Sequence, residues 1–167
     1  MEWKRGDYLL TTDPARVDVE AVHAFLAGSY WARGIPFEVV QRSVEHSLNF
    51  SLWHEPQAAT DAASAPGSSL GPATSAAQVG FARVITDYAT FGYVGDVYVL
   101  EAHRGRGLSK WMMRTMIEHP DLQGFRRWSL LTRDAHDLYR PLGFTPLASP
   151  ERWMERWLPD AYADRKK

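Results

Sequence analysis

The segment VYVLEAHRGRGLSKWMMRTM, residues 97–116, constrains the fold most, because a β-strand pattern runs through an arginine- and glycine-rich turn directly into an amphipathic helix. Gly105 and Gly107 allow backbone N–H groups to point toward one spot. Arg104 and Arg106 add full positive charges beside the positive end of the helix dipole. This arrangement is typical of a pyrophosphate site, and the alternative is a solvated turn that binds nothing.

Two common phosphate-binding patterns do not match this segment. The phosphate-loop pattern GxxxxGK[ST] is absent, and the dinucleotide pattern GxGxxG fails because Lys110 occupies the third glycine position. The sequence therefore supports neither a phosphate-loop nucleotidase nor a dinucleotide-dependent dehydrogenase.

Composition narrows the class of protein further. The 167 residues carry a net charge of -1 and contain no cysteine, which excludes thiolate catalysis, cysteine-zinc sites and a disulfide scaffold. The six histidines show no metal-ligand spacing, so we expect no metal. We expect one domain over residues 1–167, in the cytoplasm, with no membrane span, no signal peptide and no nucleic-acid partner.

Hydrophobic periodicity predicts an α/β (α+β) fold, with a mixed central sheet covered by helices. We expect Asp18 to cap the first helix, Asp134 to cap the last, and Gly143 to end it. The expected strands are 8–12, 49–54, 78–86, 91–100, 128–132 and 144–147, and the expected helices are 18–26, 36–47, 108–118 and 135–142.

Residues 56–77 differ from the rest in composition, since 19 of the 22 are Ala, Ser, Pro, Gly or Thr. Such a stretch cannot bury enough apolar surface to offset the entropy lost on ordering. We expect a low-complexity flexible loop within a hairpin, with a functional lid as the alternative.

The turn Arg104-Gly105-Arg106-Gly107-Leu108-Ser109 resembles motif A of the GCN5-related N-acetyltransferases (GNAT), [QR]-x-x-G-x-[GA], although Ser109 replaces the last Gly or Ala. The segment DAHDLYRPLGF, residues 134–144, resembles the family block A-x-x-LY-x-x-x-GF. The two motifs occur in the family order.

The resemblance implies a sheet of about six to seven strands, splayed between its fourth and fifth strands and flanked by about four helices. It also implies direct transfer of an acetyl group from acetyl-CoA to a primary amine of a small molecule or peptide. Backbone groups of Val97 and Val99 would pair with the pantetheine arm and the acetyl carbonyl. Residues Arg104, Gly105, Arg106, Gly107, Leu108 and Ser109 would cradle the pyrophosphate.

Two residues are catalytic candidates. Tyr139 matches the family tyrosine that protonates the departing thiolate, although at helical spacing with Leu138 and Leu142 it could also be a core residue. Asp96 precedes Val97 and could act as the base or contact the amine, or it could instead form a salt bridge with an arginine such as Arg83.

Four aromatic residues, Tyr30, Trp31, Phe37 and Tyr98, could line the acceptor pocket and would suit an aromatic or cationic molecule. Packing on the core is the alternative for Tyr30 and Trp31. Trp153, Met154 and Trp157 could close a homodimer interface. The functional alternative to an acetyltransferase is a catalytically idle domain of the same fold that binds acyl-CoA as a sensor or interaction module.

Overall fold

The structure is a computed structural model that describes residues 1–56, 76–158 and 160–162. One six-stranded sheet has the order β1-β2-β3-β4-β5-β6, in which only the β5–β6 pair is parallel. The strands are β1 Glu2–Arg5, β2 Tyr8–Thr11, β3 Leu48–His54, β4 Ala77–Thr86, β5 Phe91–Val99 and β6 Arg127–Ser129. The helices are α1 Val19–Gly28, α2 Phe37–Glu45, α3 Leu108–Ile117 and α4 His136–Tyr139.

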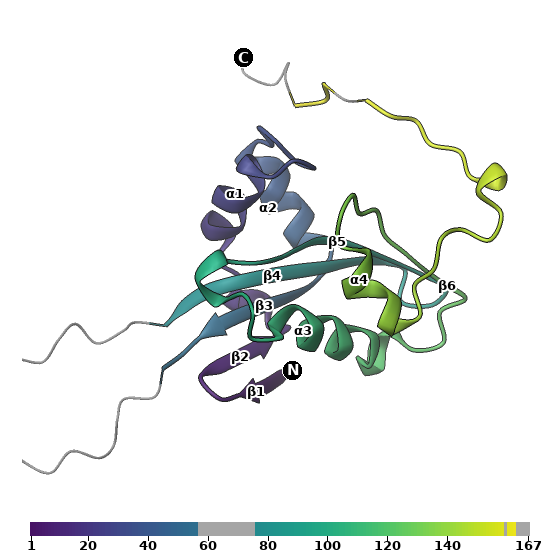
Figure 1. Ribbon diagram of the computed structural model, residues 1–167. Helices are drawn as coiled ribbons and strands as arrows, with labels where there is room; N and C mark the ends of the chain where they lie inside the picture. Colours follow the sequence, from purple (N-terminus) through teal and green to yellow (C-terminus); the bar gives the residue numbers. More distant parts are fainter. Residues whose placement is uncertain (57–75, 159, 163–167) are drawn as a thin grey trace, which may run out of the picture.

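Helices cover both faces of the sheet (Figure 1). The helices α3 and α4 lie on one face, where the core contains Phe50, Leu52, Met112, Met113 and Met116. The helices α1 and α2 lie on the other face, where a second core contains Val22, Leu26, Val40, Val44 and Phe81. This arrangement confirms the mixed sheet flanked by four helices that the sequence predicts.

Local signals explain where the first helices begin. The Asp18 carboxylate accepts a hydrogen bond of 2.9 Å from the backbone N–H of Ala21, which confirms it as the cap of α1. Pro36 precedes α2, where a residue without an N–H costs no hydrogen bond.

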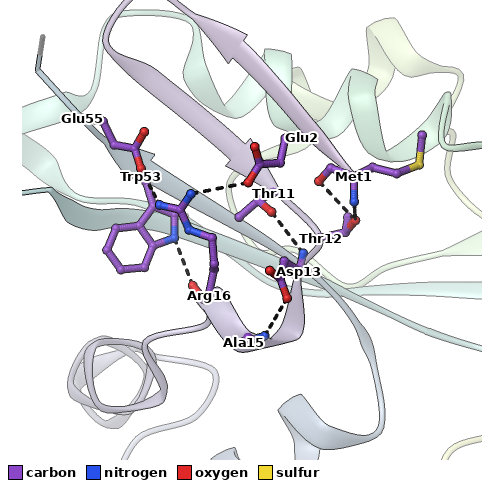
Figure 2. Close-up of polar contacts among 9 residues, drawn as sticks. All are labelled: Met1, Glu2, Thr11, Thr12, Asp13, Ala15, Arg16, Trp53 and Glu55. Carbon is purple, nitrogen blue, oxygen red and sulfur yellow. Dashed lines mark hydrogen bonds and ion pairs between the residues drawn. The ribbon is translucent and has the colours of Figure 1, made fainter.

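The sequence analysis missed β1, which pairs with β2 through a two-residue turn at Gly6 and Asp7. Gly6 has a φ of 57°, a conformation that glycine adopts without strain. Figure 2 shows polar contacts that hold the segment after β2 in place. The Arg16 guanidinium donates hydrogen bonds to the carboxylates of Glu2 and Glu55. Its backbone carbonyl accepts a hydrogen bond of 3.0 Å from the Trp53 indole N–H.

Three expectations near the C-terminus are wrong. The predicted strand 128–132 is only Arg127–Ser129, and residues 144–147 form no strand; Pro146 in that segment has no N–H to donate. The predicted helix 135–142 is α4 followed by a 3-10 turn at Arg140–Leu142, because Pro141 cannot continue the α-helical hydrogen bonds.

The predicted cap of that helix is also wrong. Ala135 precedes α4, and its N–H bonds the Thr132 hydroxyl at 3.0 Å, whereas Asp134 forms an exposed ion pair with Arg133. Gly143 does end the 3-10 turn, with a φ of 88°.

Two further expectations concern the loop at residues 56–77 and membrane-spanning helices. Most of the predicted loop 56–77 lies outside the described residues, so its alternatives stay predictions. No helix in the described ranges is long and apolar enough to cross a bilayer.

Gly80 lies where β4 meets β5, and an alanine Cβ there would come within 2.8 Å of the Tyr98 carbonyl oxygen. We expect Gly80→Ala to lower the free energy of unfolding by about 1–3 kcal/mol, because the backbone of the neighbouring strand would have to move. Chemical denaturation measures this loss.

Gly28→Ala is the matched control, because a Cβ at the end of α1 meets nothing within 4 Å and φ lies outside the left-handed region. We expect that variant to be neutral or up to about 1 kcal/mol more stable. Equal destabilisation by the two alanines would contradict the close approach of β4 and β5.

Candidate functional site

The sheet opens between β5 and β6. These strands pair only from Phe91–Tyr93 to Arg127–Ser129, so the β5 backbone from Val94 to Val99 has no strand partner on that side among the described residues. The family resemblance implied a splay between the fourth and fifth expected strands, which become β5 and β6 once β1 is counted. An unpaired strand edge leaves backbone N–H and C=O groups free to bind an extended ligand.

A β-bulge in β5 lies at this opening. Phe81 pairs with Tyr98 and Arg83 pairs with Gly95, so one residue of β4 faces both Asp96 and Val97. Asp96 has a φ of 55°, an uncommon conformation for a residue with a side chain. The bulge interrupts the β4–β5 pairing next to the open edge of β5.

Two side chains hold Asp96 in this conformation. The Arg83 Nε lies 2.5 Å from one carboxylate oxygen, and the Trp31 indole N–H donates to the other at 3.1 Å. The side chains of Arg83 and Asp96 are only 17% and 11% exposed. The structure thus contains the Arg83–Asp96 salt bridge, which the sequence analysis gave as one possible role of Asp96. Through its bond with Trp31, Asp96 also connects the bulge to the loop between α1 and α2.

Tyr139 ends α4 and lies 8% exposed in the core of the α3 face. Burial raises the pKa of Tyr139 to about 12, with smaller contributions from Tyr30 and Tyr93. The phenol therefore keeps its proton at neutral pH and can donate it. A cavity of about 580 Å³ is lined by Tyr139, Tyr93 and the segment that follows β6.

The predicted acceptor-lining residues have different surroundings. Tyr30, Trp31 and Phe37 are 40–45% exposed, so all three offer surface to a ligand. Tyr98 is 6% exposed and stacks on Phe25 with ring centroids 3.7 Å apart, so the structure places it in the core.

Sequence reasoning missed Arg133, which contacts Tyr30 across the opening. Its guanidinium lies 3.9 Å from the centre of the Tyr30 ring, and its backbone N–H donates to the Tyr30 hydroxyl at 3.3 Å. No motif in the sequence marks Arg133, because the contact joins loops 103 residues apart.

The arginine-glycine turn has the conformation that its glycines suggest. Gly105 and Gly107 have φ values of 75° and 72°, and a Cβ at Gly105 would meet nothing within 4 Å. Leu108 is buried at the start of α3, so only its backbone can reach a ligand. The Arg104 Nε donates to the Val99 carbonyl at 3.0 Å, which ties the turn to the end of β5.

This turn lies in positively charged surroundings. Arg104 and Arg106 have no carboxylate within 4 Å among the residues described. Burial lowers the pKa of His103, and the nearby His54 and Arg106 lower it further. Open space, left-handed glycines and arginines without a carboxylate partner together fit a ligand that carries phosphate groups.

Comparisons with known proteins agree with this geometry. Residues 73–146 match the family model "Acetyltransferase (GNAT) domain". A proposed acetyltransferase from Gibberella zeae is 37% identical over 147 residues, which span 82% of this chain and 78% of the relative. The chain belongs to the GNAT family.

Solved GNAT structures share the fold. A crystal structure of a proposed GNAT acetyltransferase from Xanthomonas campestris has a TM-score of 0.78 and 43% identity, covering 96% of this chain and 99% of the other. A predicted acetyltransferase from Clostridium acetobutylicum, solved with acetyl-CoA, has a TM-score of 0.57 and 14% identity, covering 89% and 94%. At that identity the second likeness concerns the fold alone.

The Arg83–Asp96 pair generates a stability prediction. We expect Asp96→Asn to lower the free energy of unfolding by about 2–4 kcal/mol, because it leaves the charge of a largely buried arginine uncompensated. The double variant Arg83→Met/Asp96→Asn should lose less than the sum of the two single losses in a denaturation cycle.

Asp134→Asn is the matched control, because its ion pair with Arg133 is 63–66% exposed. Exposed pairs contribute about 0–1 kcal/mol. Strict additivity in the cycle, or equal losses from Asp96→Asn and Asp134→Asn, would contradict a buried coupling at the bulge.

Proposed function

We propose that this protein transfers an acetyl group from acetyl-CoA to a primary amine of a small molecule or peptide, acting as a single domain. The observation that carries the proposal is the open edge of β5, which leads directly into the arginine-glycine turn at the start of α3. The Clostridium acetobutylicum protein, which shares this fold, was solved with acetyl-CoA, and we propose the same donor for this chain.

The donor has two parts that the site can hold separately. Backbone groups of Val97 and Val99 would pair with the pantetheine arm and the acetyl carbonyl, although Val99 already accepts a hydrogen bond from Arg104. The backbone N–H groups from Arg104 to Ser109 and the arginine side chains would hold the pyrophosphate. Bound in this way, acetyl-CoA supplies an activated acyl group at the bulge.

Tyr139 and Asp96 would take part in proton transfer. Tyr139 would donate its proton to the leaving thiolate, since burial keeps the phenol protonated. Asp96 would accept a hydrogen bond from the amine N–H, because its two carboxylate oxygens offer about four acceptor sites and the structure uses two. As the nitrogen bonds the acetyl carbon, Asp96 would take the proton that the nitrogen loses and release it to solvent, from which Tyr139 regains its own proton. Tyr30, Trp31 and Phe37 would line the approach of the amine, and their rings suit an aromatic or cationic acceptor.

The decisive experiment measures release of the CoA thiol when acetyl-CoA is mixed with a panel of primary amines, together with acetyl-CoA affinity by calorimetry. Amine-dependent thiol release supports the transferase. Tight binding of acetyl-CoA without release across the panel would favour the idle acyl-CoA-binding module. Absence of acetyl-CoA binding would contradict both functions.

Tyr139→Phe tests the proton donor. We expect kcat to fall on the order of 10–1000-fold, while the Kd for acetyl-CoA stays nearly unchanged, because only the hydroxyl is lost. In the wild type, ionisation of Tyr139 should not lower kcat until the pH approaches the pKa of about 12.

Tyr88→Phe is the control, because it makes the same chemical change on an exposed turn between β4 and β5. Wild-type kcat in Tyr139→Phe would show that the thiolate takes its proton from elsewhere.

A further inference from the structure

The N-terminal strand β1 brings a third arginine to the arginine-glycine turn. The Arg5 Nη1 donates to the Gly107 carbonyl oxygen at 3.3 Å, across 102 residues of sequence. Its guanidinium also lies 6.0 Å from the centre of the Trp111 ring in the first turns of α3. A Cβ at Gly107 would have the two terminal nitrogens of Arg5 as its nearest neighbours, at 3.6 and 3.7 Å.

The bond to Gly107 does not explain why a cation is there. The Gly107 carbonyl already accepts the helical hydrogen bond from the Trp111 N–H at 3.0 Å, so this backbone group would remain satisfied without Arg5. The Arg5 contact is exposed and long, and ordering an arginine side chain costs conformational entropy. The cation–π contact with Trp111 is at the outer limit of the useful distance, and such contacts are weak at exposed sites.

The charges around the turn also favour a bound anion. Arg5, Arg104 and Arg106 lie at this turn, and none of them has a carboxylate within 4 Å among the described residues, so their positive charge is not compensated there. Like charges gathered at one place repel one another, and a bound anion would relieve that repulsion. The Arg104 Nε already donates to Val99, whereas Arg5 uses one of its five N–H donors in the part of the chain that the structure describes.

We propose that Arg5 binds a phosphate group of the CoA donor, as a third arginine of the cradle formed by residues 104–109. This proposal rests on the proposed function, because it requires CoA to bind at that turn. A guanidinium suits the role, since its planar N–H groups can donate to two phosphate oxygens at once. The strand β1 would then have a part in donor binding as well as in the sheet.

The test compares Arg5→Gln with wild type by calorimetric titration of CoA at low and high salt. Glutamine keeps an N–H for Gly107 and an aliphatic stem against Trp111 but has no charge. We expect the Kd for CoA to rise about 3–10-fold at low salt, and this difference to shrink as salt screens the charge. A purely structural role would raise Kd by the same factor at both salt concentrations.

Lys4→Gln is the matched control, because it removes the same charge from the neighbouring exposed residue, whose side chain points to the other face of β1. We expect its Kd to stay within about twofold of wild type, since a screened charge without a direct contact contributes little. An equal rise in Lys4→Gln and Arg5→Gln would overturn the proposal, because it would reflect net charge only.

Dephospho-CoA, which lacks the 3′-phosphate, identifies the phosphate group. If Arg5→Gln weakens CoA and dephospho-CoA equally, Arg5 contacts the pyrophosphate; if it weakens only CoA, Arg5 contacts the 3′-phosphate. Unchanged CoA affinity in Arg5→Gln overturns the role of Arg5 but leaves the proposed function standing. Failure of the wild type to bind CoA would overturn the proposed function itself.

Discussion

The ion pair between Arg83 and Asp96 is the interaction on which the site depends. Asp96 lies in a left-handed backbone conformation within the bulge of β5, and such a conformation persists only where the surroundings hold it. Arg83 from β4 and Trp31 from the α1–α2 loop both bond its carboxylate. One largely buried carboxylate therefore joins the bulge, the centre of the sheet and the aromatic loop between α1 and α2.

The position of the arginine-glycine turn depends on packing and hydrogen bonds in a similar way. Leu108 and the methionines of α3 are buried in one core with residues of the sheet, so packing holds the start of the helix beside β5. Arg104 then ties the turn back to Val99, and the positive φ values of Gly105 and Gly107 set the direction of the backbone. The bulge and the turn thus lie at the two ends of one short segment, residues 96–109, whose path is fixed by core packing.

Local chemistry explains which features the sequence could predict. Strong periodicity located β3, β4, β5 and α3 to within about two residues, and Asp18 marked α1 through its capping carboxylate. The strand β1 was missed because it has four mostly polar residues, although Gly6-Asp7 was a usable hairpin signal. The turn and Tyr139 followed from motifs, whereas Arg5 and Arg133 reach the site through contacts about 100 residues apart in sequence, which local patterns cannot show.

We propose that the open edge of β5 and the arginine-glycine turn together bind the donor. Hydrogen exchange of backbone amides, followed by mass spectrometry with and without CoA, tests it most directly. We expect CoA to slow exchange in peptides that cover residues 94–99 and 104–109, because the ligand would occupy backbone N–H groups there. Slowed exchange confined to other parts of the chain, with these two segments unchanged, would contradict donor binding at the β5 edge and the turn.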